Sequence, residues 1–230
     1  MSTDPGPKDL AAGGERLQAF ADRALHWPAR HRLLVADLHL GKGDVFRRAG
    51  IAVPRGGAAQ DLARLDALLV ATGARELWVL GDLVHGPVPD APWRMQWGAW
   101  RERHATLRVA VVAGNHDRAL GPGSAAAARL GVELLPPVLR DGPFELRHAP
   151  PHADGDRGRD GRDNDIVLCG HLHPVFALPG MARRWPGFWQ RPDMLVLPAF
   201  SAFTGGWRVD LAAGERALLC VEGSVIPLSR

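Results

Sequence analysis

Short apolar runs alternate with polar segments along the chain, and several of these runs end in a glycine followed by acidic, amide or histidine residues. The run at 109–112, Val-Ala-Val-Val, contains only small and β-branched residues, a composition typical of a strand covered on both faces. Gly114 then permits a tight turn into Asn115, His116 and Asp117. The pattern predicts a buried strand that ends at a candidate site.

The apolar periodicity predicts that strands and helices alternate along most of the chain. Strands are predicted at 16–27, 31–36, 76–80, 109–112, 144–147, 165–169, 194–197, 218–221 and 224–227. Helices are predicted at 60–71, 93–107 and 121–131, and a loop or helix at 40–48. This alternation indicates an α/β protein. Because the sequence contains neither an internal repeat nor a separating linker, we expect one domain over residues 1–230.

Three segments are expected to lie outside the regular elements. Residues 1–14 contain Gly and Pro and are predicted to be flexible. Residues 152–164 mix Gly with nearly balanced Asp and Arg, a composition too polar to bury, so a mobile loop is predicted there. Residues 181–193 are predicted to form a basic, aromatic connection.

The predicted helix at 93–107 carries Trp93, Trp97, Trp100 and His104 at helical spacing. A stripe of this kind marks a buried face more often than a platform on which nucleic-acid bases stack. We therefore interpret these tryptophans as core residues.

Composition limits the function only loosely. A chain of 230 residues with 46% hydrophobic residues is long enough to bury a sizeable core. The formal net charge of +3 and the isoelectric point of about 9.5 permit a polyanionic partner without requiring one. Cys169 and Cys220 lie in apolar runs and are interpreted as buried thiols of a reducing compartment. Since no stretch approaches the roughly 18 apolar residues of a membrane span, we expect a cytoplasmic protein.

Polar residues suited to metal binding follow the predicted strands at the edge where open α/β sheets place their sites. They are Asp37, His39, Asp82, Asn115, His148, His171 and His173. Seven nitrogen and oxygen ligands are too many for one zinc ion, so the set predicts two divalent ions, most readily Mn²⁺, with Fe or Zn as alternatives. Asp82 stands between two ligand groups and is the natural bridge. The remaining histidines are interpreted as structural: His26, His31, His85, His104 and His152.

Further residues near the predicted ligands are candidates for catalysis and substrate binding. His116 can donate or accept a proton near neutral pH, and Asp117 is predicted to orient its ring. Lys42, Arg47 and Arg118 could hold phosphate groups. For the cations at 42–48, a solvated helix face is the simpler alternative, and it stays open.

The complete motif set closely resembles that of the calcineurin-like metallophosphoesterase superfamily. The matching segments are Asp37-Leu38-His39, Gly81-Asp82, Gly114-Asn115-His116-Asp117, His148 and Gly170-His171-Leu172-His173. The resemblance implies a four-layer α/β sandwich, in which two facing mixed sheets are flanked by helices. It also implies one metal held by Asp37, His39, Asp82 and His173, and another held by Asp82, Asn115, His148 and His171. Enzymes of this superfamily use a metal-bridging hydroxide for in-line attack on phosphorus.

A narrower resemblance points to the ligase-associated DNA damage response endonucleases of PdeM type. It rests on Ala-Asp-Leu-His-Leu-Gly-Lys at 36–42, the segment 50–54, Leu-Gly-Asp-Leu-Val-His-Gly at 80–86, Gly-His-Leu-His-Pro at 170–174, and Leu-Pro-Ala-Phe at 197–200 with Thr-Gly-Gly at 204–206. The resemblance implies DNA as substrate, a role in DNA repair, and a link to a DNA ligase, a helicase and an exonuclease. Residues of the connection 181–193 could contact phosphates and stack on exposed bases, so we expect single-stranded or distorted DNA; they are Arg183, Arg184, Trp185, Phe188 and Trp189. The chain departs from the wider superfamily in having His85 where an Arg commonly follows Gly81-Asp82.

Two other functions remain compatible with the sequence. The same chemistry could act on a small phosphodiester or a nucleotide. A protein-binding scaffold that has lost catalysis is a third possibility, although the complete ligand set and His116 argue against it.

Overall fold

The computed structural model describes residues 6–86, 91–121, 125–151 and 165–230, except for the side chains of residues 118 and 119. Its first sheet has seven strands that follow one another in sequence order. They are β1 (Lys8–Ala12), β2 (Glu15–Phe20), β3 (Ala24–Trp27), β4 (Arg32–Val35), β5 (Glu76–Leu80), β6 (Arg108–Val112) and β7 (Glu133–Leu135). Strands β1 to β4 pair antiparallel, whereas β4 to β7 pair parallel, so the carboxyl ends of β4 to β7 share one edge.

The second sheet contains the remaining nine strands. They are β8 (Val138–Asp141), β9 (Phe144–Arg147), β10 (Ile166–Cys169), β11 (Pro174–Ala177), β12 (Arg184–Gln190), β13 (Met194–Val196), β14 (Trp207–Arg208), β15 (Arg216–Val221) and β16 (Ser224–Ser229). The order β14-β11-β12-β13-β10-β9-β8 is extended by β15, which pairs with β12 and β16. Strands β9, β10 and β13 are parallel, so this sheet also has an edge of carboxyl ends.

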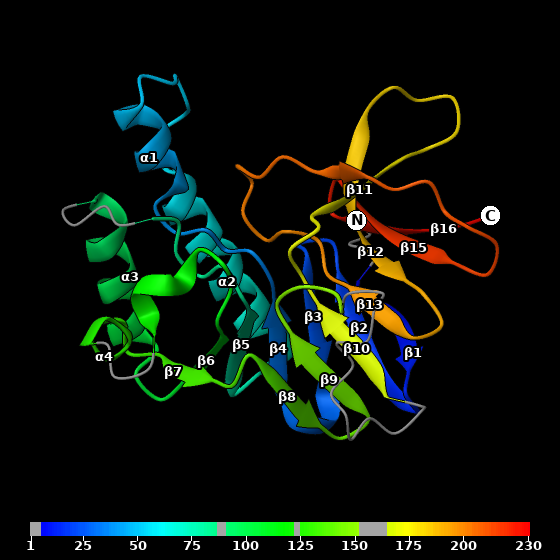
Figure 1. Cartoon of the computed structure of the whole chain (residues 1–230), viewed down its shortest axis with the longest axis horizontal. Coiled ribbons are helices and arrows are strands. Elements are labelled where there is room, and N and C mark those ends of the chain that lie inside the picture. Colours follow the sequence, from blue (N-terminus) through cyan, green and yellow to red (C-terminus); the bar gives the residue numbers. More distant parts are fainter. Residues whose placement is uncertain (1–5, 87–90, 122–124, 152–164) are drawn as a thin grey trace, which may run out of the picture.

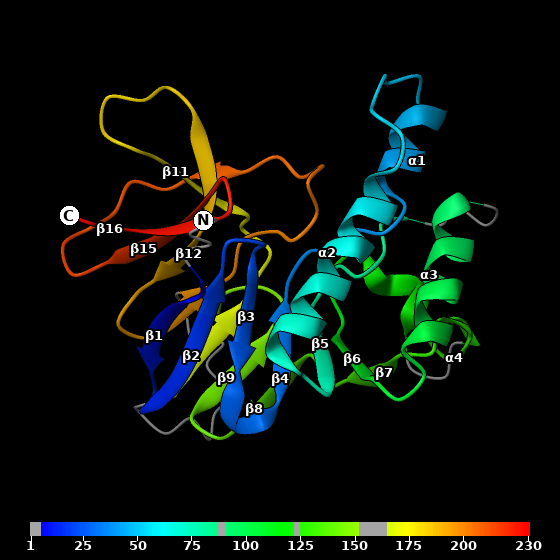
Figure 2. The same cartoon turned by 180° about the vertical axis from the view of Figure 1, so that it is seen from behind.

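The α-helices lie on the outer side of the first sheet, and α1 projects beyond the other three (Figures 1 and 2). They are α1 (Lys42–Arg48), α2 (Gly57–Thr72), α3 (Pro92–Arg103) and α4 (Ala125–Leu130), with short 3₁₀ turns at Pro28–Arg30 and Asp117–Leu120. Trp93, Trp97 and Trp100 pack with leucines of α2 against this face and are almost fully buried. The interpretation of this tryptophan stripe as core is confirmed.

The two sheets face each other across a second apolar core. Within β4, Leu33 packs toward the helices and Leu34 toward the second sheet, and the same alternation recurs in the neighbouring parallel strands. Both faces of these strands are therefore covered, which is why their sequences read as continuous apolar runs. The expected α/β class with two facing mixed sheets is confirmed.

The outer face of the second sheet is covered differently from the expected helical layer. Val209 and Leu211, from the extended segment between β14 and β15, pack there with Cys169, Trp189 and Leu219. In the described part of the chain, no helix lies on this face. The fourth layer is thus formed by extended chain.

Several sequence expectations change in the structure. Residues 8–12 are not flexible, because β1 pairs with β2 over its whole length. The predicted strand 16–27 is divided into β2 and β3 by a turn at Arg23, whose φ is +66°. The predicted connection 181–193 contains β12, held between β13 and β15. The predicted mobile loop 152–164 lies outside the described residues.

Two smaller expectations can also be compared with the structure. Cys169 and Cys220 are buried free thiols, as predicted, and burial raises the pKa of both, that of Cys220 to about 12. Among the described residues, no helix is both long and apolar enough to cross a membrane.

Candidate metal centre

The predicted metal ligands converge because the carboxyl ends of both sets of parallel strands meet. Asp37 and His39 follow β4, Asp82 follows β5, Asn115 follows β6, His148 follows β9, and His171 and His173 follow β10. Hydrogen bonds from backbone N–H groups join the two edges: Phe200 N–H donates to the Ala36 carbonyl, and His171 N–H donates to Asp37 Oδ2 (2.9 Å). The two sheets are thereby held together at the site.

Carboxylates and imidazoles form two overlapping groups in which the ligand atoms all lie within 4.8 Å of one another. The first group is Asp37, His39 and His173, and the second is Asp37, Asp82 and His148. Asp82 Oδ2 lies 3.9 Å from His39 Nε2 and 3.6 Å from His148 Nε2, so it faces a ligand of each predicted metal. This position suits the bridging role predicted for Asp82.

The remaining predicted ligands complete the second side of the site. His148 Nε2 lies 2.9 Å from Asn115 Oδ1 and 3.0 Å from His171 Nδ1. Asp37, His39, Asp82 and His148 are buried, whereas Asn115 and His171 are exposed. The centre thus has a buried floor and an open side that a substrate can reach.

Two buried polar atoms at the floor of the site make no hydrogen bond, although Asp37 Oδ1 lies 3.2 Å from His173 Nε2. Within the part of the chain that the structure describes, Asp37 Oδ1 and His39 Nε2 are buried and have no hydrogen bond. The pKa of His39 is lowered to about 2, mainly because its ring is buried, with smaller contributions from Lys42 and neighbouring histidines. A neutral imidazole is the form that binds metals, and a buried carboxylate oxygen without a hydrogen bond is costly unless another group, such as a cation, compensates it. The donor set therefore fits divalent cations.

Backbone carbonyls orient two of the imidazoles. His148 Nδ1 lies 3.1 Å from the Leu80 carbonyl oxygen, and His173 Nδ1 lies 3.2 Å from that of Gly205. A hydrogen bond donated from Nδ1 leaves Nε2 as the free acceptor that faces the centre. Gly205 belongs to the Thr-Gly-Gly segment noted in the sequence, which accordingly supports His173.

The backbone is strained at most of the predicted ligands. Positive φ angles occur at Asp37 (55°), His39 (48°), Asp82 (53°), His171 (69°) and His173 (49°). Left-handed conformations of non-glycine residues cost on the order of 1–3 kcal/mol each and persist where the surrounding structure imposes them. Their concentration here indicates that the fold has placed these side chains at some expense of stability.

Two positions in the motifs require glycine because predicted metal ligands lie too close to the backbone there to leave room for a β-carbon. A β-carbon on Gly114 would lie 2.2 Å from Asp82 Oδ1, and one on Gly81 would lie 2.0 Å from His148 Nδ1. Any larger residue at these positions would displace a predicted metal ligand. The glycines of the Gly-Asp and Gly-Asn-His-Asp motifs are thus part of the construction of the site.

His116 and His85 form a stacked pair beside the predicted ligands. The His116 backbone N–H donates to Asp82 Oδ1 (2.9 Å), and its exposed ring stacks on His85 with 4.5 Å between centroids. His85 Nδ1 lies 3.3 Å from His39 Nδ1. Burial, followed by His116 and Lys42, lowers the pKa of His85 to about 4. His85, interpreted from the sequence as a structural residue, therefore lies beside the predicted ligands, and its position three residues after Asp82 was the available signal.

The other histidines that were interpreted as structural lie apart from the centre wherever the structure describes them. His26 bonds to Gln18, His104 bonds to Asp66, and His31 is exposed at the opposite end of β4. His152 lies outside the described residues.

Asp117 has partners other than the one expected. Its carboxylate accepts hydrogen bonds from the backbone N–H groups of Leu83 (3.2 Å), Val84 (3.0 Å) and Gly114 (3.0 Å). Among the described contacts, none joins it to the His116 ring. The pKa of the Asp117 carboxyl is raised, mainly because the group is buried, although the backbone hydrogen bonds act to lower it. These bonds indicate that Asp117 fixes the two loops that carry Asp82 and Asn115, in place of the orienting role predicted from sequence.

Replacing Asp117 with Asn should therefore destabilise the metal-free protein. The amide group cannot accept all three N–H bonds, and an unsatisfied buried group costs about 1–3 kcal/mol. For a chain of this size, that loss corresponds to a drop in Tm of roughly 2–12 °C. Thermal unfolding in the presence of a chelator measures the effect, with Asp22→Asn at an exposed turn as the control. An unchanged Tm would contradict the structural role.

The three predicted phosphate-binding cations have different environments. Lys42 is partly buried, and its pKa is lowered mainly by burial, although Asp37 and Asp82 act to raise it. Arg47 bonds to Asp44 (2.5 Å) and to the Pro54 carbonyl (3.1 Å), so it also stabilises the loop that follows α1. The side chain of Arg118 lies outside the described residues.

The aromatic residues of the segment 181–193 do not form the stacking surface considered from sequence. Trp185, Phe188 and Trp189 are buried in or beneath the second sheet. Arg183 is exposed and pairs with Glu222.

Two facing mixed sheets that bring Asp, Asn and His ligands together at their strand ends define an α/β metallophosphoesterase, a class of metal-dependent enzymes. The chain belongs to the calcineurin-like phosphoesterase family, whose model matches residues 31–148. His171 and His173 lie beyond that match and reach the site through the second sheet.

The chain is similar in structure to a nuclease. It is 37% identical to Pseudomonas putida nuclease MPE, with a TM-score of 0.79 over 97% of this chain and 100% of that one. It is also 19% identical to Yfce, a phosphoesterase from E. coli, over 86% of this chain and 97% of that one, with a TM-score of 0.47, too low to support an argument. No curated protein matches the chain significantly. The nuclease agrees with the narrower resemblance noted in the sequence.

Proposed function

We propose that the protein is a dinuclear-metal phosphodiesterase that cleaves DNA as an endonuclease. The observation that carries this proposal is the convergence of all seven predicted ligands at one edge, where buried Asp37 Oδ1 and His39 Nε2 make no hydrogen bond among the described residues. One ion would be held by Asp37, His39, Asp82 and His173, and the other by Asp82, Asn115, His148 and His171. The similarity to a nuclease supports DNA as the substrate.

The chemistry of the site is divided between the ions and the side chains of the chain. When bound, two divalent ions neutralise the phosphoryl oxygens and lower the pKa of water toward neutrality. His116, exposed and anchored through its backbone to Asp82, is placed to protonate the leaving oxygen. Lys42 lies near the two aspartates and offers a cation to a non-bridging oxygen of the substrate.

The biological setting proposed here follows the narrower resemblance. Mn²⁺ is the proposed metal, with Fe or Zn as alternatives, because the ligands are oxygen and imidazole nitrogen atoms. We place the protein in the cytoplasm, in DNA repair, with a functional link to a DNA ligase, a helicase and an exonuclease. We keep single-stranded or distorted DNA as the proposed substrate, although the buried Trp185, Phe188 and Trp189 supply no base stacking for it.

The purified protein is expected to bind two Mn²⁺ ions per chain and to lose phosphodiesterase activity when they are chelated. Elemental analysis after saturation and gel filtration gives the number of ions, and hydrolysis of bis(p-nitrophenyl) phosphate before and after treatment with chelator gives the activity. Restoration of activity by added Mn²⁺ serves as the control for irreversible damage. A ratio of one ion per chain or fewer after saturation, or turnover indifferent to chelator, would refute the dinuclear proposal.

Hydrolysis assays distinguish the candidate functions. The substrates are single-stranded, nicked, flapped and duplex DNA, together with small phosphodiesters. Cleavage of DNA supports the endonuclease. Hydrolysis of small diesters alone would transfer the proposal to a small phosphodiester or nucleotide. A metal-loaded protein that hydrolyses none of them would be a scaffold.

A further inference from the structure

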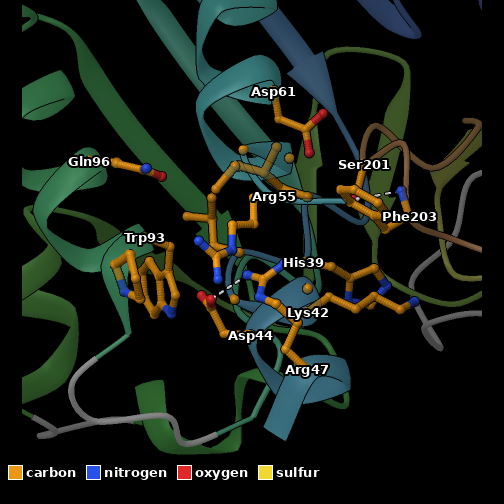
Figure 3. Close-up of a pocket in the computed structure, with 18 residues that line it drawn as sticks. His39, Lys42, Asp44, Arg47, Arg55, Asp61, Trp93, Gln96, Ser201 and Phe203 are labelled. Atoms are coloured by element: carbon orange, nitrogen blue, oxygen red, sulfur yellow. Dashed lines mark hydrogen bonds and ion pairs between the residues drawn. The ribbon is translucent and has the colours of Figure 1, made fainter. Parts of the chain in front are cut away.

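A cavity of about 450 Å³ opens beside the metal centre (Figure 3). Its walls come from α1, from the start of α2, from α3 and from the loop containing Ser201 and Phe203. His39 and Lys42 line the cavity as well as the centre, so the two spaces adjoin. The volume lies within the range of small-molecule sites and exceeds that of a phosphate group alone.

The cavity carries an excess of positive charge. Lys42, Arg47 and Arg55 line it together with the acids Asp44 and Asp61. Asp44 is paired with Arg47, and Asp61 is paired with Arg64, 2.9 Å away. Among the described residues, neither Lys42 nor Arg55 has an ion-pair partner. Two cations therefore remain available for an anionic ligand.

The amino terminus of α2 adds to the positive electrostatic potential in the cavity. The helix has 16 residues, its N-cap Gly56 makes no side-chain capping bond, and its first turn contains no acid. Gly56, Gly57 and Ala58 line the cavity, so the amino-terminal turn of α2, the positive end of the helix dipole, forms part of its wall. A β-carbon on Gly57 would lie 1.8 Å from the Phe203 ring, which shows how closely this ring packs on the start of the helix.

The backbone that precedes the exposed Arg55 is bonded to α1. The Arg47 guanidinium donates to the Pro54 carbonyl (3.1 Å), which fixes the neighbouring residue against α1. Figure 3 shows Lys42, Arg47 and Arg55 around one space, with Trp93 on one side and Phe203 on the other. Arg47 thus links α1 to the backbone next to Arg55.

We propose that this cavity binds a second phosphate group of the nucleic-acid strand, one nucleotide from the phosphate that is cleaved, and that Arg55 is its main side-chain contact. This inference rests on the proposed phosphodiesterase function and specifies the substrate of the same site. A second phosphate in the cavity would fix the direction in which the strand crosses the metal centre. The site would then discriminate a nucleic-acid strand from a simple diester.

The test compares substrates that differ by one phosphate, using the full-length, Mn²⁺-loaded protein. The substrates are bis(p-nitrophenyl) phosphate, a dinucleotide with one internal phosphate, and the same dinucleotide with an additional 5′- or 3′-phosphate. A second phosphate at one end should raise kcat/KM by about tenfold or more, the effect of one charge-assisted hydrogen bond. Arg55→Ala and Arg55→Gln should abolish this gain, whereas Arg48→Ala, exposed on α1 and outside the cavity, should retain it.

Each outcome of this comparison is decisive. If neither terminal phosphate raises kcat/KM, or if both Arg55 variants keep the full gain while their Tm equals that of the wild type, the proposed subsite is wrong. Should the wild-type protein hydrolyse bis(p-nitrophenyl) phosphate without any preference, only the subsite fails and the phosphodiesterase function stands. If no diester is hydrolysed, the proposed function fails and the subsite fails with it.

Discussion

Asp82→Asn is expected to lower phosphodiester hydrolysis by more than about 100-fold and to weaken metal binding on both sides of the centre. Substitutions of groups that only support a metal ligand cost about 10–100-fold, so loss of a bridging ligand should exceed that range. The physical reason is charge: Asp82 Oδ2 faces His39 and His148, and a neutral amide bridges two cations poorly.

Replacement by asparagine isolates the effect of the negative charge because it preserves the size of the side chain. Its carbonyl oxygen can still accept the His116 N–H that Asp82 Oδ1 accepts now. Metal titration by calorimetry, together with turnover as a function of Mn²⁺ concentration, measures the effect, with Asp22→Asn as the control. If the variant bound two ions with wild-type affinity, Asp82 would not be the bridge.

His116→Ala is expected to lower kcat by about 10²–10⁴-fold while both metals stay bound, because a general acid contributes a factor of that size. The His116 side chain is exposed and contacts His85 and His39 only through ring packing, so its loss removes no predicted metal ligand. Turnover of a diester with an alkoxide leaving group and metal content together measure the prediction. His31→Asn, at the opposite end of β4, is the control.

The choice of leaving group tests the role of His116 directly. Nitrophenolate leaves without protonation, so bis(p-nitrophenyl) phosphate should lose much less activity than the alkyl diester in this variant. Equal losses on both substrates would exclude proton donation as the function of His116. An emptied metal site would instead make His116 a ligand.

The sequence by itself determined the class of fold and the ligand types. Continuous apolar runs identify strands covered on both faces, and polar residues placed directly after such strands must gather where parallel strands end. This rule needs only local patterns, which is why Asp37, His39, Asp82, Asn115, His148, His171 and His173 could all be selected beforehand. Helical periodicity likewise assigned the tryptophans of α3 to the core correctly.

Only the tertiary structure decided which partner each remaining residue has. Asp117 is next to His116 in sequence, yet its carboxylate bonds to N–H groups of Leu83 and Val84, more than thirty residues away. His85 enters the site because the loop after β5 lies beside the loops after β4 and β6. Contacts of this kind depend on how loops pack across a sheet edge, and no periodicity encodes them.

The difference between local sequence patterns and long-range packing also explains the segments that were assigned wrongly from the sequence. The segment 181–193 is rich in Arg and aromatic residues, which suggested a binding surface, but β12 lies between β13 and β15 and buries Trp185, Phe188 and Trp189. The cavity beside the centre likewise exists only because α1, α2 and α3 meet there. Local sequence fixed which side chains could do chemistry, whereas long-range packing decided which of them face the substrate.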